Sequence, residues 1–212
     1  MEKAMRDFFD KRGPILVKNL QKRHFEAYYC ATRAEALQQV LSLLPEGSTV
    51  GWGGAISAAQ VGVQEAVHGG NYNVIDRDRF TDPAEKLRCM RQCFDADYFI
   101  TGANAISLDG QMVNIDGNGN RVGMIVYGPQ NIIVVAGMNK VCATLEDAVR
   151  RARTVAAPMN QQRFGLPNPC TCTGVCADCL SETSICNQIL ITRNCKPAGR
   201  IKFVLVGEEL GL

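Results

Sequence analysis

The chain has 212 residues, of which 46% are hydrophobic and 21% charged, and its formal net charge is +2. This length and hydrophobicity are enough for one large globular domain, and because Lys and Arg are scattered along the chain, we expect no nucleic-acid partner. No stretch approaches the roughly 18 apolar residues of a membrane span, and the first six residues begin a charged amphipathic stretch without an apolar signal core, so we expect a cytoplasmic protein.

The N-terminal segment has the hydrophobic spacing of helices. Apolar residues recur every three or four positions within residues 8–20 and again within residues 34–44, directly before a Pro-Glu-Gly turn. We therefore interpret residues 1–46 as a helical N-terminal lead-in. Residues 47–212 are then the main α/β domain.

The main domain alternates strand-like and helix-like segments. Strands are predicted at 48–52, 73–76, 98–101, 111–115, 131–136, 188–191 and 201–206, and helices at 53–67, 82–94 and 144–155. Asp82, followed by Pro83 and Glu85, has the pattern of a helix start. Residues 131–136 form an uninterrupted apolar run, which is typical of a strand buried on both faces of a parallel sheet. The order predicts an α/β sandwich with a mostly parallel sheet flanked by helices.

A glycine-rich turn follows the first strand of the main domain. In parallel α/β sheets, ligands lie outside the carboxyl ends of the strands. The backbone amides of Gly53 and Gly54, which begin a helix, could hold a carboxylate or phosphate, although the glycines could equally serve close helix–strand packing. A nicotinamide-binding fingerprint is disfavoured, because Ile56 stands where its third small residue is required.

Two further segments carry candidate ligand-binding groups. Residues 116–121 read Asp-Gly-Asn-Gly-Asn-Arg, a turn whose amides are exposed and whose Arg121 could grip an anion, unless it is only a solvated loop. Lys140 follows the most buried strand and could pair with an anionic ligand, unless it is an ordinary surface lysine. We expect one crevice for a small anionic substrate. Its candidate catalytic residues are Asn104, Asp116, Arg121 and Lys140, and its candidate ligand-binding residues are Gly53, Gly54, Asn118 and Asn120.

The C-terminal part of the chain is rich in cysteine. Six of the ten cysteines lie between residues 170 and 195, and four read C-x5-C-x2-C-x6-C: Cys170, Cys176, Cys179 and Cys186. In a reducing compartment such clusters usually bind metals or act in redox chemistry. Zinc sites usually present two C-x-x-C pairs, whereas this loop has one and delivers its other thiols at uneven spacing, as iron–sulfur proteins do. We therefore predict a metal-binding loop at 165–197 holding an iron–sulfur cluster, with structural zinc or free redox-active thiols as alternatives.

The other six cysteines have simpler interpretations. Cys172 and Cys195 are spare thiols of the same region, and Cys195 could replace one of the four. The remaining cysteines are isolated or lie on apolar helix positions, where a free thiol usually packs as a small hydrophobic group; they are Cys30, Cys89, Cys93 and Cys142.

Three segments resemble a known family. Residues 101–121, which end in Asp-Gly-Asn-Gly-Asn-Arg, are similar to the central signature of the lactate-utilisation (LUD) domain family, as are residues 134–140 and 204–211. The resemblance covers most of the chain from about residue 33 and includes the four-cysteine pattern, which is found in short members of that family. Cys172 occupies a variable position in the pattern.

The resemblance implies a fold and a pathway. The fold would be a Rossmann-like, mostly parallel sheet of the NagB/RpiA/CoA-transferase-like group. The pathway would be the oxidation of lactate or a similar hydroxy acid. The cysteines would hold a [4Fe–4S] cluster, and the chain would form a homodimer that acts beside iron–sulfur partner proteins. Some isomerases of that group carry a catalytic acid where this chain has Asn104, which cannot ionise. An isomerase or transferase acting on a phosphate or carboxylate, and a metal-stapled scaffold protein, are the alternatives.

Overall fold

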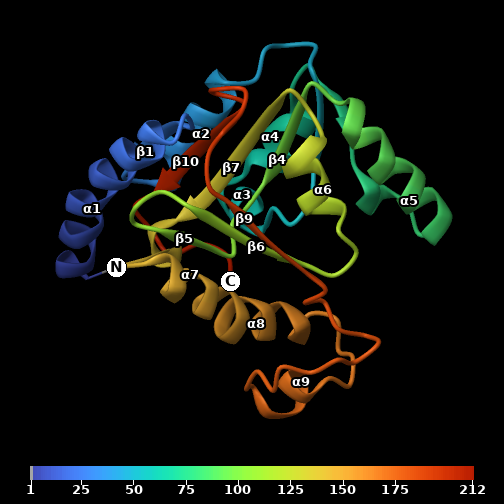
Figure 1. Ribbon diagram of the computed structural model, residues 1–212. Coiled ribbons are helices and arrows are strands. Elements are labelled where there is room, and N and C mark those ends of the chain that lie inside the picture. The colour runs from blue at the N-terminus through green and yellow to red at the C-terminus, as the bar shows by residue number, and fades with distance from the viewer. Residues whose placement is uncertain (1) are drawn as a thin grey trace.

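The core of the protein is a six-stranded sheet in which every neighbouring pair is parallel (Figure 1). The computed structural model describes residues 2–212. In spatial order the strands are β1 (Glu26–Cys30), β10 (Ile201–Val206), β7 (Asn131–Gly137), β4 (Tyr98–Thr101), β2 (Thr49–Trp52) and β3 (Asn73–Ile75). The parallel sheet flanked by helices confirms the predicted α/β class.

Strand β1 corrects the prediction for the N-terminal segment. Residues 1–46 were expected to be helical, but Glu26–Cys30 pair with β10 along one edge of the main sheet, between helices α1 and α2. The segment therefore contributes a strand to the core and is more than a lead-in. Its Glu-Ala-Tyr-Tyr-Cys sequence is only partly buried, as befits an edge strand, and so shows little hydrophobic periodicity.

Helices cover both faces of the sheet. On β7, Ile132 and Val134 face the layer of α1, α5 and α6, whereas Ile133 and Val135 face α2, α3 and α4. This two-sided burial explains the continuous apolar run in the sequence. The helices are α1 (Lys3–Lys22), α2 (Arg33–Ser42), α3 (Ile56–Val61), α4 (Val63–Gly69), α5 (Pro83–Gln92) and α6 (Asn120–Tyr127). Short 3-10 turns are η1 (Arg77–Arg79), η2 (Cys93–Asp95) and η3 (Met138–Lys140). Residues 53–67, predicted as one helix, are divided by Gly62 at φ +89°.

A second, smaller sheet lies beyond the carboxyl ends of the main strands. Its order is β8 (Val141–Cys142), β5 (Ala105–Ser107), β6 (Met112–Asp116) and β9 (Gln188–Thr192). On β6, Met112 packs into the main core, while Val113 and Ile115 pack on the helices beneath. Those helices form a continuous rod of α7 (Leu145–Arg151), the π-helical turn η4 (Ala152–Ala156) and α8 (Ala157–Gln162). The predicted strand at 188–191 thus belongs to this sheet.

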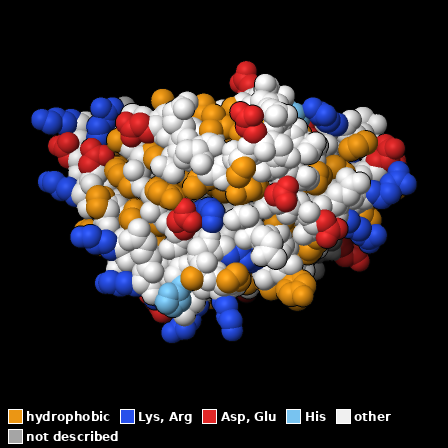
Figure 2. All heavy atoms as spheres, turned by 90° about the horizontal axis from the view of Figure 1, so that it is seen from above, with side chains coloured by type: hydrophobic (Ala, Val, Ile, Leu, Met, Phe, Trp, Pro, Cys, Tyr) orange, Lys and Arg blue, Asp and Glu red, His pale blue; other side chains and the backbone are white. Residues whose placement is uncertain are grey.

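The cysteine-rich segment lies at one end of the molecule. It leaves α8, forms the short helix α9 (Pro169–Thr173) and returns through a loop to β9, below the body of the protein in Figure 1. On the face shown in Figure 2, Lys and Arg are spread along the edges, with acidic and uncharged side chains between them. Across residues 2–212, no helix is both long and apolar enough to cross a membrane.

Candidate functional site

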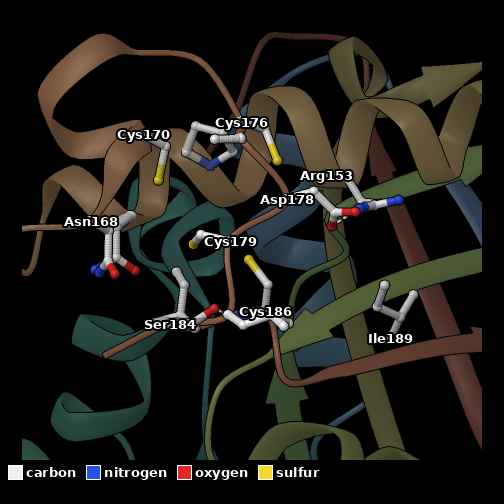
Figure 3. Close-up of a pocket in the computed structure, with 14 residues that line it drawn as sticks. Arg153, Asn168, Cys170, Cys176, Asp178, Cys179, Ser184, Cys186 and Ile189 are labelled. Carbon is white, nitrogen blue, oxygen red and sulfur yellow. Dashed lines mark hydrogen bonds and ion pairs between the residues drawn. The ribbon is translucent and has the colours of Figure 1, made fainter. Parts of the chain in front are cut away.

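The four cysteines of the predicted metal site line one cavity. Cys170, Cys176, Cys179 and Cys186 border a space of about 130 Å³ between α8, α9 and the loop before β9. Their sulfur atoms point toward the same space in Figure 3. Residues that are up to sixteen positions apart in the sequence therefore line the same space.

Asn168 fastens the two halves of this loop. Its side chain is buried and donates from Nδ2 to the Thr183 carbonyl oxygen at 3.2 Å, while its Oδ1 accepts from the Thr183 hydroxyl at 3.1 Å. Its own carbonyl oxygen accepts from the amides of Thr171 and Cys172 at the start of α9. One asparagine thus closes the loop around the cavity.

The loop is also tied to the small sheet. The Asn187 amide donates to the Asp116 carbonyl oxygen at 3.1 Å, and its side-chain Nδ2 donates to the Gly117 carbonyl oxygen at 3.1 Å. On the opposite side of the cavity, Asp178 forms an ion pair with Arg153 of η4. Cys186 is therefore next to a residue that is anchored on the Asp116 turn.

Burial and neighbouring negative charge raise the pKa of two of the four thiols. Burial raises the pKa of Cys170, and negative charge on Cys179 and Cys176 raises it further. Burial likewise raises the pKa of Cys186, and the other three thiols of the cavity add to the effect. Four thiolates in one cavity repel one another, so full ionisation requires a cation between them.

The spare thiols lie elsewhere. Cys172 is exposed and does not line the cavity. Cys195 is buried, donates to the Pro197 carbonyl oxygen at 3.1 Å and accepts from the Ile201 amide at 3.3 Å. Its thiol is therefore hydrogen bonded to backbone groups away from the cavity. Within residues 2–212, no group of three or more His, Cys, Asp or Glu side chains is arranged so that it could hold a metal ion. The four thiols surround their cavity without meeting at one ion position.

A second polar cluster lies at the carboxyl ends of the main strands. It is built on the carbonyl groups of the segment 102–104, which follows β4. The Gly102 oxygen accepts from Asn114 Nδ2 at 3.0 Å and the Ala103 oxygen from Lys140 Nζ at 3.1 Å. The Asn104 oxygen accepts from Arg151. Three polar side chains from different elements thus converge on three successive residues.

Arg121 is held by Asp116. The Asp116 carboxylate accepts from the backbone amides of Gly119, Arg121 and Val122 at 3.1–3.3 Å and lies 3.6 Å from Arg121 Nε. Arg121 also donates to the Asn104 side-chain oxygen at 3.1 Å. Burial lowers the pKa of Arg121, while the Asp116 charge opposes that effect. The Asp-Gly-Asn-Gly-Asn-Arg turn therefore binds its own arginine.

Lys140 is buried without a charged partner in its hydrogen bonds. Its Nζ donates to the Ser57 hydroxyl at 3.2 Å and to the Ala103 carbonyl oxygen, both neutral acceptors. Burial, followed by the positive charges of Arg151 and Arg121, lowers the pKa of Lys140 to about 7. Only 4% of the residue is exposed. A lysine in this state exchanges its proton near neutral pH and would gain from a nearby anion.

The C-terminal tail covers this lysine. A β-carbon added to Gly211 would lie 2.6 Å from Lys140 Nζ, so the tail backbone runs directly over the amine. The Leu210 amide donates to the Asn139 side chain at 3.1 Å, and the Gly211 amide donates to the Gln60 side chain at 2.6 Å. The tail therefore shields Lys140 from solvent.

The structure brings five of the eight candidate ligand-site residues together. Asn104, Asp116, Arg121 and Lys140 meet in the cluster, and Gly54 lies against Arg121. Asn120 is half-buried at the start of α6. In contrast, the Gly53 amide donates to the Ile100 carbonyl oxygen, and Asn118 is exposed on the turn. The Gly53 amide is thus occupied by the sheet and not free for a ligand.

Three contributors were missed. Ser57, Asn114 and Arg151 all donate or accept within the cluster. Ser57 lies one turn after the Gly53-Gly54 turn, which was a usable signal. Asn114 is a fully buried amide between the apolar residues Val113 and Ile115 of β6, and its Oδ1 has no hydrogen-bond partner. Arg151 looked like an ordinary charged residue near the end of a helix.

The parallel sheet, the small second sheet and the polar cluster at the strand ends define an α/β protein with a buried cationic site. The LUD domain family model matches residues 14–206, so the chain belongs to the LUD domain family. This confirms the resemblance noted in the sequence.

Two solved structures are similar to the chain. One is a crystal structure of a DUF162 family protein from Deinococcus radiodurans, 13% identical, which covers 95% of this chain and 97% of that one with a TM-score of 0.52. It supports the fold. The other is ribose 5-phosphate isomerase A from Methanocaldococcus jannaschii, 15% identical, over 63% of this chain and 66% of that one with a TM-score of 0.32. No curated protein sequence matches the chain.

Proposed function

We propose that this protein is a redox component of the LUD family that carries an iron–sulfur cluster on Cys170, Cys176, Cys179 and Cys186. It would serve the utilisation of lactate or a similar small hydroxy acid in the cytoplasm, as a homodimer beside iron–sulfur partner proteins. The observation that carries the proposal is that these four thiols surround one cavity, while Cys172 and Cys195 lie outside it.

The common cavity of the four thiols supports this proposal. The thiols line a space of about 130 Å³ and come from α9 and the loop that follows it. Four cysteine thiolates are the ligand set of an iron–sulfur cluster, which when bound supplies a one-electron carrier. Gln161 lines the same cavity, and its buried Nε2 lacks a hydrogen-bond partner. An unpaired donor on a residue that lines this cavity suits a group rich in sulfur acceptors.

Loading requires this chain to release protons and adjust its loop. The raised pKa of Cys170 and Cys186 means that these thiols ionise as the cation enters. The thiols must also turn further into the cavity, which lies in a segment of exposed loop and one short helix. Metal binding and ordering of residues 165–187 are therefore coupled.

Metal analysis of single variants tests the assignment. Protein purified without oxygen should contain iron and acid-labile sulfide and absorb visible light. Serine at Cys170, Cys176, Cys179 or Cys186 should abolish both contents, whereas Cys172→Ser, a matched control from the same loop, should keep them. Retention of iron in the four variants, or loss only in the control, would refute the ligand set. Zinc without sulfide would instead support the structural-metal alternative.

A second candidate function rests on the buried Lys140. Its neutral hydrogen-bond partners and the neighbouring Arg151 leave an excess of positive charge in the cluster, which suits a carboxylate or phosphate. The small anionic substrate of the pathway would bind there, and an isomerase or transferase could use the same groups. Asn104 cannot ionise and is already hydrogen bonded to Arg121.

Ligand titration distinguishes these uses. Lactate should perturb the side-chain NMR signal of Lys140 and raise its pKa, because an anion favours the charged amine. Lys140→Met should remove the response, whereas replacement of an exposed lysine such as Lys11 should not. An unchanged Lys140 signal at saturating lactate and inorganic phosphate would exclude this site for both anions.

A further inference from the structure

Gln161 is the unusual residue of the cysteine cavity. It lies in the last turn of α8, where the neighbouring Gln162 is exposed, yet only 2% of Gln161 is accessible to solvent. Its Nε2 has no hydrogen-bond partner, although buried amide groups are almost always paired. An amide is costly in such a place, so its position beside the four thiols requires an explanation.

Two neighbouring amides show what sets Gln161 apart. Asn168 also lines the cavity, but its side-chain nitrogen and oxygen are both hydrogen bonded to Thr183. Gln162 donates from Nε2 to the carbonyl oxygens of Cys170 and Thr171 at 3.0 and 3.3 Å, which holds the loop from outside. Those two side chains position the loop backbone. Gln161 has no such bond and borders the space that the sulfurs face.

We propose that Gln161 Nε2 donates a hydrogen bond to a sulfur of the bound cluster or of its cysteine ligands and so raises the reduction potential of the cluster. The inference rests on the proposed iron–sulfur site and assigns a tuning role to a residue outside the cysteine pattern. Gln161 is then an outer residue that touches the cofactor without being one of its ligands.

The physical reason is the change in charge on reduction. An added electron makes the sulfur atoms more negative and therefore better acceptors, so an N–H group stabilises the reduced state more than the oxidised state. The low dielectric of a buried site increases the difference. Loss of one such hydrogen bond should lower the ratio of reduced to oxidised cluster about tenfold at a given potential. For a one-electron couple, this corresponds to a shift of about 59 mV in the midpoint potential.

The test is a redox titration of the loaded protein followed by electron paramagnetic resonance. Gln161→Met keeps the size of the side chain and removes the donor; it should keep the iron content and lower the midpoint potential by about that amount. Asn160→Leu is the control on the same helix; it loses a side-chain amide that bonds only to Arg163, outside the cavity, and should keep the wild-type potential. Gln161→His, which restores a ring N–H, should recover part of the shift.

Each outcome decides between distinct statements. If the wild-type protein binds no iron, the proposed function fails. If it binds iron and Gln161→Met has the wild-type potential, or Asn160→Leu shifts the potential equally, the inference on Gln161 fails while the cluster stands. If Gln161→Met loses the cluster, retention in Gln161→His and Asn160→Leu supports the donor, whereas loss in all three variants shows that α8 only supports the loop and overturns the inference.

Discussion

Replacing Lys140 by methionine should remove a specific pH dependence of stability. In the folded protein the pKa of Lys140 is lowered from 10.5 to about 7, chiefly by burial and then by Arg151 and Arg121. Between these two pH values the unfolded chain binds the proton and the folded protein does not. The free energy of unfolding therefore rises with pH, by about 1.4 kcal/mol per pH unit for this one group.

The difference between wild type and variant isolates the effect. Other titrating groups are common to both proteins, and their contributions cancel in the difference. The free energy of unfolding of the wild type, minus that of Lys140→Met, should therefore rise by about 3 kcal/mol between pH 7 and 9.5. Below pH 6 the lysine is charged in both states, and the difference should be flat. Methionine keeps most of the volume of the side chain and carries no charge at any pH.

Urea denaturation followed by circular dichroism at half-unit pH steps measures this difference. Lys11→Met, at an exposed position of α1, serves as the control and should give a constant difference over the same range. A flat difference for Lys140→Met as well would mean that the buried lysine titrates near its ordinary value. The account of the cluster as an excess of buried positive charge would then be wrong.

Three further substitutions probe the Arg121 pairing, the C-terminal tail and the core of the main sheet. Asp116→Asn should destabilise the protein by about 3 kcal/mol in urea denaturation, because it leaves the buried Arg121 without its counter-charge; a loss below about 1 kcal/mol would contradict the pairing. Gly211→Ala should displace the tail, since its φ is +65° and the new methyl group would meet Lys140, and should increase the rate at which an amine reagent modifies that lysine; an unchanged rate would show that the tail is no cover. Phe203→Ala, in the middle of β10, should cost roughly 3–5 kcal/mol, and a fully retained melting temperature would disprove its place in the core.

The parts of the fold that could be predicted are those with strong local signals. The apolar run of β7 identified a strand buried on both faces. The start of α5 was also predictable, because Asp82 accepts from the Glu85 amide at 3.1 Å as a helix cap does. Strands β1, β5 and β8 were missed. Strand β1 is a half-buried edge strand, and β5 and β8, with three and two residues, are too short for a periodic pattern.

The candidate site divides in the same way. The four cysteines are spaced in one loop, so their proximity followed from the sequence. Arg151 and Gln161 reach their sites only because the rod from α7 to α8 packs beneath the second sheet. No local sequence pattern predicts this packing. A buried glutamine inside an amphipathic helix looks like any polar residue until the surroundings are known. The tail over Lys140 likewise depends on contacts between distant segments.

The bond between Asn187 and Asp116 joins the two candidate sites through one residue. Asp116 uses its carbonyl oxygen to hold the end of the cysteine loop and its carboxylate to hold Arg121. Where two ligands bias the same element, thermodynamic linkage makes the influence reciprocal: the factor by which cluster loading changes anion affinity equals the factor by which the anion changes cluster affinity. Under the proposed function, a group held by the four cysteines would therefore change the affinity of the Lys140 cluster for an anion without a domain movement.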